Sequence, residues 1–249
     1  MSAGRREWRG WIPPALRRNR AALRLREVWR AIMWMRATGP FIAETRAQAA
    51  FAGVRPGASI MVFGPARIGK TRVCRIVADA MGWQYVDADR LVAGLYRGVD
   101  AEGLRHWCLR LFLRRLLRAV PEGACIDCPF LLDIFTADPG FLVRIAGKSR
   151  LYPVSSRAPV AERLRAMRHQ RASLAGCWTL GRVPEGELRA FAEQIVRSCG
   201  EVDAVCQKLG LRPVLVEPGD FDRSAHRAAR TIVAGAIVAG ASRPSAARA

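Results

Sequence analysis

Short apolar runs alternate with longer amphipathic stretches along most of the chain, beginning near residue 53. Each run is short enough for one buried strand, and the strands are expected at 58–64, 83–89, 123–132, 149–154 and 211–217. Between and after them, apolar residues recur three or four positions apart, which predicts helices at 70–82, 103–120, 158–172, 185–209 and 224–238. Strands that alternate with helices pair in parallel through right-handed crossovers. The pattern therefore predicts a three-layer α/β/α fold, in which helices cover both faces of a five-stranded parallel sheet.

The first fifty residues depart from this pattern because arginine is so frequent among them. A helix that starts after Pro13-Pro14 would have a partly apolar face, made by Leu16, Leu23, Val28, Trp29, Ile32 and Met33. Such a helix either packs on the surface of the main domain, or contacts nucleic acid or an acidic membrane surface, or targets an organelle. We expect it to be less ordered than the main domain. The chain then divides into a basic helical extension at 1–50, a main domain at 51–240 and a disordered tail at 241–249.

The formal net charge is +20 over 249 residues, and almost all of the basic residues are arginine. This charge has two interpretations: the composition of a GC-rich source, or a polyanionic partner such as nucleic acid or an anionic substrate. A content of 51% hydrophobic and 25% charged residues is typical of a globular chain. No stretch reaches the roughly 18 apolar residues that span a bilayer.

The N-terminus lacks the apolar core of a secretory signal, so we expect a cytoplasmic protein whose seven cysteines are mostly buried thiols. Cys125 and Cys128 form a lone C-x-x-C inside an apolar run. No second such pair accompanies it, which favours core packing over metal or redox chemistry.

The stretch GPARIGKT at 64–71 has the spacing of a phosphate-binding loop, and it lies between a predicted strand and a predicted helix, as such a loop must. Its backbone N–H groups would surround the phosphates, Lys70 would bridge the β- and γ-phosphates, and the Thr71 hydroxyl would bind Mg²⁺. We predict a nucleotide site made by Gly64, Pro65, Ala66, Arg67, Ile68, Gly69, Lys70, Thr71 and Arg72.

Arg67 occupies a variable position of the loop, where related loops often carry glycine. Its guanidinium group either points into solvent or curls over the γ-phosphate or a second substrate. A third alternative is that it crowds the loop and weakens binding.

Three aspartates are the candidate acidic partners of the loop. Asp127 ends the apolar run ACID and is the expected second Mg²⁺ ligand, although a strand-end carboxylate can also cap a turn. Asp87 and Asp89 come after the second predicted strand, at the edge of the sheet where ligands bind. Two residues apart in extended chain, they would face the same way and act on Mg²⁺ or on a substrate hydroxyl. Asp89 is equally suited to cap the next helix.

Four arginines come after the fourth strand in ERLRAMRHQR, at 163, 165, 168 and 171. At helical spacing Arg168 and Arg171 share a face, where they could clamp phosphates and stabilise the group in transfer. We predict Arg168, with Lys70, Asp87 and Asp89, as catalytic. The alternative is a solvated basic face, since arginine is so abundant in this chain.

Together these motifs resemble the P-loop small-molecule kinases, namely the shikimate, gluconate and nucleoside-monophosphate kinases, from about residue 58 to 235. The resemblance implies the P-loop NTPase fold, ATP with Mg²⁺, and transfer of the γ-phosphoryl group to a small-molecule or nucleotide acceptor. The chain departs from shikimate kinases after the third strand, where DCPFLLD replaces their glycine-rich substrate signature.

The opening GVRPGASIMVFGPARIGKTR also resembles that of an AAA-type ATPase. This resemblance implies ATP hydrolysis without a small acceptor, or a nucleic-acid-associated use of the same fold through the arginine-rich segment. Against it, Cys128 comes directly after Asp127 where such ATPases carry a glutamate base.

Overall fold

The computed structural model describes residues 20–51, 57–128, 138–173 and 183–241. The strands are β1 (Ile60–Phe63), β2 (Gln84–Asp87), β3 (Ala124–Asp127), β4 (Leu151–Ser155) and β5 (Val214–Leu215). The helices are α2 (Arg20–Phe51), α3 (Lys70–Met81), α4 (Asp89–Gly98), α5 (Glu102–Ala119), α7 (Pro139–Ala146), α8 (Val160–Ser173), α9 (Leu188–Leu209) and α10 (Phe221–Ala241), with short 3₁₀ turns at Lys148–Arg150 and Glu185–Glu187. The expected helix start at Pro13-Pro14, the end of the third predicted strand at 129–132 and the tail at 242–249 lie outside the described residues.

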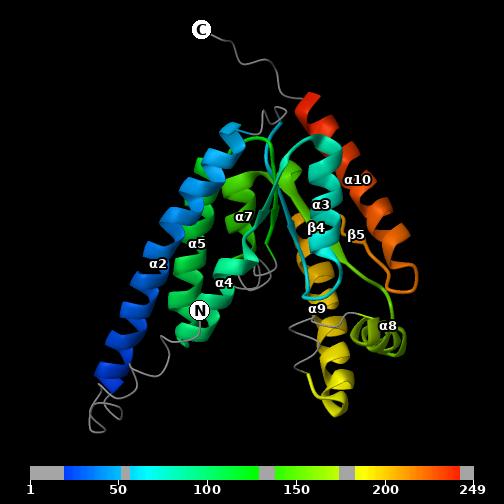
Figure 1. The fold of residues 1–249 in the computed structure, drawn as a ribbon, viewed down its shortest axis with the longest axis horizontal. Coiled ribbons are helices and arrows are strands. Elements are labelled where there is room, and N and C mark those ends of the chain that lie inside the picture. Colours follow the sequence, from blue (N-terminus) through cyan, green and yellow to red (C-terminus); the bar gives the residue numbers. More distant parts are fainter. Residues whose placement is uncertain (1–19, 52–56, 129–137, 174–182, 242–249) are drawn as a thin grey trace.

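The sheet has the order β2-β3-β1-β4-β5, and all of its strand pairs are parallel. Helices cover both of its faces, with α2, α4, α5 and α7 on one side and α3 and α10 on the other (Figure 1). The last turns of α9 join the core on the α7 side, and its first half packs with α8 in the other core cluster. The predicted fold class is therefore confirmed. β5 is much shorter than the run at 211–217 that predicted it. Pro213 immediately before it lacks a backbone N–H, which suits an edge position but shortens the ladder.

Each face of the sheet has its own apolar core, because successive residues of a strand point to opposite sides. Met61 and Phe63 of β1 pack toward α2 and α5, whereas Ile60 and Val62 pack toward α3 and α10. All four side chains are 1% exposed or less. A central strand covered on both faces has a continuous apolar sequence, which is why the run IMVF predicted it.

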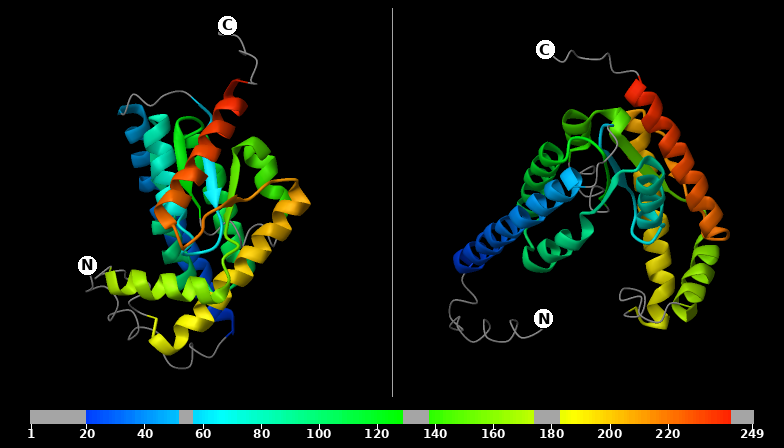
Figure 2. Two further views of the ribbon diagram at one scale, coloured as in Figure 1. Left: turned by 90° about the vertical axis from the view of Figure 1, so that its right-hand side faces the viewer. Right: turned by 45° about the horizontal axis from the view of Figure 1, so that its top comes forward.

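α2 is a long helix that lies along α4 and α5 (Figures 1 and 2). Trp34 Nε1 donates to the Leu91 carbonyl oxygen of α4 at 2.8 Å, and Arg30 Nη1 donates to the Gly98 carbonyl oxygen at 3.0 Å. The Trp34 ring also meets Phe112 of α5 edge-on, with centroids 5.7 Å apart. Arg20–Phe51 therefore packs on the main domain, because Trp34 and Phe41 join its core. No helix in the described ranges is long and apolar enough to cross a membrane.

Candidate nucleotide site

The glycine loop lies where the strand order of the sheet reverses. The crossover after β1 leads to β2 on one side, whereas the crossover after the neighbouring β3 leads to β4 on the other, so the two diverge at the carboxyl ends of β1 and β3. Open parallel sheets bind ligands at such a switch point. A Cβ on Gly64, the first loop residue, would collide with the Val154 carbonyl oxygen of β4. Only glycine therefore allows the loop to leave β1 so close to β4.

The loop ends at Gly69, whose φ of 96° and contact with the Phe221 ring both exclude a larger residue. Lys70 is the first residue of α3 and is only 5% exposed. Its Nζ donates to the Pro65 carbonyl oxygen on the opposite side of the loop. The ammonium group and the positive end of the α3 dipole thus lie together at the loop, which is an arrangement that stabilises an anion.

Thr71 and Asp127, the two predicted Mg²⁺ ligands, are in direct contact. Thr71 Oγ1 donates to Asp127 Oδ2 at 2.7 Å, and Asp127 is 2% exposed at the end of β3. A hydroxyl and a carboxylate oxygen suit Mg²⁺, which takes one or two protein oxygens together with substrate phosphates. Within the described residues, no cluster of three His, Cys, Asp or Glu side chains could hold a metal alone. The pair therefore fits a Mg²⁺ ion that arrives with a nucleotide.

The two aspartates of the DAD sequence lie in different elements. Asp87 ends β2, and the strand register pairs it with Asp127 on β3. Asp89 is already the first residue of α4, because Ala88 has helical angles of φ −78° and ψ −18°. The prediction that the chain is extended from Asp87 to Asp89 is therefore wrong. The cap position that suited Asp89 belongs to Ala88.

The pKa of Tyr85, which lies two residues before Asp87 on β2, is affected by the carboxylates of Asp87 and Asp127. Burial raises the pKa of its hydroxyl, and the negative charges of Asp127 and Asp87 raise this pKa further. Above about pH 10, Tyr85 therefore ionises in the unfolded chain before it does in the folded protein, and stability falls as pH increases.

We expect Tyr85→Phe to remove this loss. Urea unfolding at a series of pH values should give a constant difference from wild type below about pH 10. Above about pH 10, the free energy of unfolding should fall for wild type but not for the variant, so the difference should shift in favour of the variant. A difference that does not depend on pH would show that burial and the two carboxylates do not raise the pKa of Tyr85.

A narrow cleft opens beside the loop, between α8 and the turn from β5 to α10. Its walls are Arg67, Ile68, Arg163, Ala166, Met167, Gln170, Val216, Pro218 and Phe221. Arg67 is half-buried there and has the left-handed φ of 63°. Arg67 therefore faces a cleft at the glycine loop. This position favours the interpretation in which its guanidinium group curls over the γ-phosphate or a second substrate.

The left-handed backbone at Arg67 allows backbone strain to be measured separately from the function of the side chain. Any residue with a Cβ pays about 1 kcal/mol for this conformation, and glycine does not. Arg67→Gly should therefore be more stable than Arg67→Ala by about 1 kcal/mol in urea unfolding. Both variants should lose the same amount of ATP affinity, since both lack the guanidinium group. Equal stability of the two variants would contradict the observed loop conformation.

Arg163 is the charged residue buried most deeply in the cleft. It is 3% exposed, and its Nε and Nη2 have no hydrogen-bond partner within the part of the chain that the structure describes. Burial lowers the pKa of Arg163, and the neighbouring Cys199, Glu217 and Glu162 oppose that shift. A buried guanidinium group with unused donors is costly unless an acceptor contacts it. The cleft is narrow, with a volume of about 10 Å³, so these donors suit a single acceptor atom or a water molecule.

Glu217 fixes the two walls of this cleft to each other. Its carboxylate accepts hydrogen bonds from the Ser156 hydroxyl at 2.8 Å and from the backbone N–H groups of Arg157 and Ala158 at 3.0 and 3.1 Å. These three residues form the turn into α8, and Glu217 belongs to the turn into α10. Its own N–H donates to Ser224 Oγ at 2.8 Å. Glu217 therefore positions α8, and Arg163 with it, against the loop.

The predicted catalytic Arg168 lies on the exposed face of α8. Its Nε contacts Glu185 Oε1 at 2.8 Å, and Arg171 Nη1 contacts the other oxygen of that carboxylate at 3.2 Å. Arg168 is not one of the cleft residues, so its catalytic role stays a prediction. Arg72, at the outer side of α3, pairs with Asp222 at 3.5 Å on the surface.

No protein-family model matches the chain, and no curated protein matches it. Among solved structures it is similar to a shikimate kinase from Bacteroides thetaiotaomicron, with a TM-score of 0.47 and 14% identity over 70% of this chain and 98% of that one. It is also similar to a shikimate kinase from Acinetobacter baumannii in complex with shikimate, with a TM-score of 0.43 and 14% identity over 78% and 98% of the two chains.

Arg163 was among the four arginines of ERLRAMRHQR, but the prediction chose Arg168 as catalytic, and Glu217 was not predicted at all. A signal for Arg163 does exist, because Met167 lies one helical turn after it and marks the same face of α8 as buried. Glu217 contacts residues about sixty positions earlier, and no local pattern encodes such a contact.

Proposed function

We propose that this protein binds ATP with Mg²⁺ and transfers the γ-phosphoryl group to a small-molecule or nucleotide acceptor. The observation that carries this proposal is the 2.7 Å contact between Thr71 and Asp127 beneath the glycine loop. A loop of exposed N–H groups binds phosphate, and a buried carboxylate beside it gives the site a position for the accompanying cation.

Each residue of the loop region then has a defined task. The loop N–H groups and Lys70 would bind the β- and γ-phosphates, for which Lys70 Nζ has to exchange the Pro65 carbonyl oxygen for a phosphate oxygen. Thr71 and Asp127 would hold Mg²⁺, which supplies charge neutralisation of the transferring group. Asp87, beside Asp127 in the sheet, would accept a hydrogen bond or a proton from the acceptor hydroxyl.

The cleft between α8 and α10 adjoins the proposed phosphate site, but with a volume of about 10 Å³ it has room for about one water molecule and not for the base of the nucleotide. It adjoins the loop directly through Arg67 and Ile68, and Arg163 offers unused hydrogen-bond donors inside it. The apolar side chains of Met167, Val216 and Phe221 line the same cleft. A phosphate oxygen at the mouth of the cleft, or a water molecule inside it, would be an acceptor for the unused donors of Arg163.

Transfer is favoured over plain hydrolysis because the position after Asp127 holds Cys128, which cannot serve as a carboxylate base for water. Burial of Cys74 and of its neighbours Cys125 and Cys128, all thiols, also supports the proposed cytoplasmic location.

The experiment is a measurement of ADP release from ATP and Mg²⁺, with and without a panel of small hydroxyl, carboxylate and nucleotide acceptors. The proposal expects ADP release that depends on one class of acceptor. Release at the same rate without any acceptor would replace it with an ATPase.

A further inference from the structure

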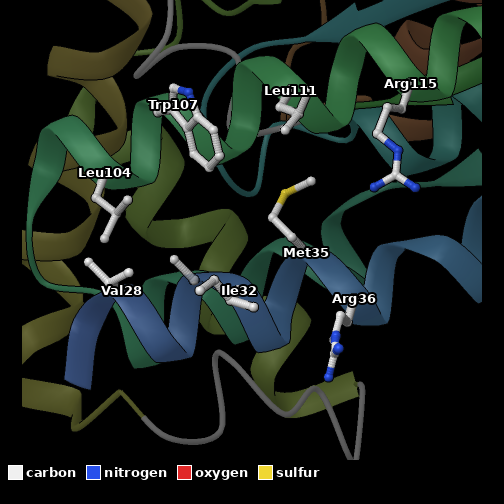
Figure 3. Close-up of a pocket in the computed structure, with 9 residues that line it drawn as sticks. Val28, Ile32, Met35, Arg36, Leu104, Trp107, Leu111 and Arg115 are labelled. Atoms are coloured by element: carbon white, nitrogen blue, oxygen red, sulfur yellow. The ribbon is translucent and has the colours of Figure 1, made fainter. Parts of the chain in front are cut away.

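A second hollow lies on the opposite side of the sheet from the α8–α10 cleft, between α2 and α5. It is an apolar groove of about 700 Å³, lined by Val28, Ala31, Ile32, Met35, Arg36, Leu104, Trp107, Leu111 and Arg115. Figure 3 shows the side chains of α2 and α5 facing each other across it, with Arg36 and Arg115 at one end. None of the lining residues is acidic.

The apolar surface extends beyond the groove onto the outer face of α2. Leu25, Trp29 and Met33 are 71%, 55% and 45% exposed, and Trp107 on α5 is 57% exposed. Single exposed apolar residues are ordinary, but large ones at helical spacing on one face, next to an apolar groove, make a contiguous patch. We call Leu25, Val28, Trp29, Ile32, Met33 and Trp107 the α2 patch.

Exposed arginines lie on both helices that carry this patch. Arg24, Arg26 and Arg36 on α2 and Arg115 and Arg118 on α5 are all exposed. In the sequence before α2, residues 1–19 add five arginines and two tryptophans against one glutamate. Exposed apolar side chains with tryptophan among them and arginine at the margin are the composition of a helix that lies in the interface of an anionic membrane.

We propose that the α2 patch binds the surface of an anionic lipid bilayer. Leu25, Trp29 and Met33 would enter the interfacial layer, and the exposed arginines would contact lipid phosphates and carboxylates. The exposed arginines on both helices favour an anionic lipid surface over an apolar partner helix. A second copy of this chain is disfavoured, because two molecules of net charge +20 repel each other.

The test is co-sedimentation of the full-length protein with vesicles of phosphatidylcholine alone and with equal parts of phosphatidylserine. We expect binding only to the anionic vesicles, and weaker binding as salt is added. Trp29→Glu should reduce partitioning by about tenfold or more, because it removes an inserted ring and adds a repelled charge.

Ile237→Glu is the matched control. Ile237 on α10 is 56% exposed, almost the same as Trp29, but lies outside the patch. It should bind vesicles like wild type, and both variants should keep the thermal midpoint of wild type because both positions are exposed.

The proposal is wrong if wild type does not bind anionic vesicles, or if Trp29→Glu and Ile237→Glu lose vesicle binding equally. It is also wrong if vesicle binding survives Trp29→Glu but requires residues 1–19. A dimer in solution that Trp29→Glu dissociates would show that a second copy covers the patch. If the protein does not bind vesicles but binds a partner protein through Trp29, the patch is a protein-binding surface instead.

Discussion

Asp127→Asn is expected to lower acceptor-dependent ADP formation by at least about 100-fold, because the change removes the charge that would bind Mg²⁺. The substitution is mild for the fold. An asparagine oxygen can still accept the hydrogen bond that Thr71 Oγ1 donates at 2.7 Å. Since Asp127 is a buried carboxylate with 2% exposure, its neutral substitute should leave the free energy of unfolding unchanged or raise it.

A second readout separates this electrostatic role from simple damage. The charge of Asp127 helps to raise the pKa of Tyr85, so Asp127→Asn should lower that pKa toward its ordinary value. The matched control is Asp203→Asn on the exposed surface of α9, which should change neither activity nor the pKa of Tyr85. Undiminished activity of Asp127→Asn would remove Asp127 from the site.

Trp34→Ala is expected to destabilise the protein by about 3–5 kcal/mol, the cost of deleting a buried aromatic side chain. Trp34 is 8% exposed, meets Phe112 edge-on, and donates to the Leu91 carbonyl oxygen at 2.8 Å. Trp34→Phe should keep most of the ring contact and lose the hydrogen bond, at a cost of about 1 kcal/mol.

Trp29, five residues earlier on the same helix, is the matched control because it is 55% exposed. Trp29→Ala should change the free energy of unfolding by about 0.5 kcal/mol or less in urea titrations. Similar, small effects of Trp34→Ala and Trp29→Ala would mean that α2 does not pack on α4 and α5. The packing of Trp34 matters for the site, because α2 holds α4 in place and α4 begins two residues after Asp87.

Local patterns predicted the parts of this protein that local forces determine. The run IMVF, the glycines at 64 and 69 and the apolar face of α3 together placed the loop between a strand and a helix. Asp127 was predicted from the apolar run ACID, although the strand itself was expected to continue to 132. These features need only the periodicity of strands and helices and the close approach that glycine allows.

Features that depend on tertiary packing were missed or misplaced. Whether Asp89 continues a strand or begins a helix depends on how α4 packs under α2, and the apolar run before it fits both. Arg163 and Arg168 lie on one helix in one arginine-rich stretch, yet the packing of α8 buries the first and exposes the second beside Glu185. The lead helix looked weakly apolar because its buried and exposed apolar residues lie on different faces.

The measurement that tests the central claim most directly is a calorimetric titration of ATP with Mg²⁺ into wild type, Lys70→Ala and Lys208→Ala. Lys70 is buried in the loop, whereas Lys208 is an exposed lysine in the last turn of α9. We predict saturable binding by wild type and by Lys208→Ala, and affinity at least about 100-fold weaker for Lys70→Ala. Equal affinity of Lys70→Ala and wild type, or no binding of ATP by folded wild type, would contradict a nucleotide site at the glycine loop.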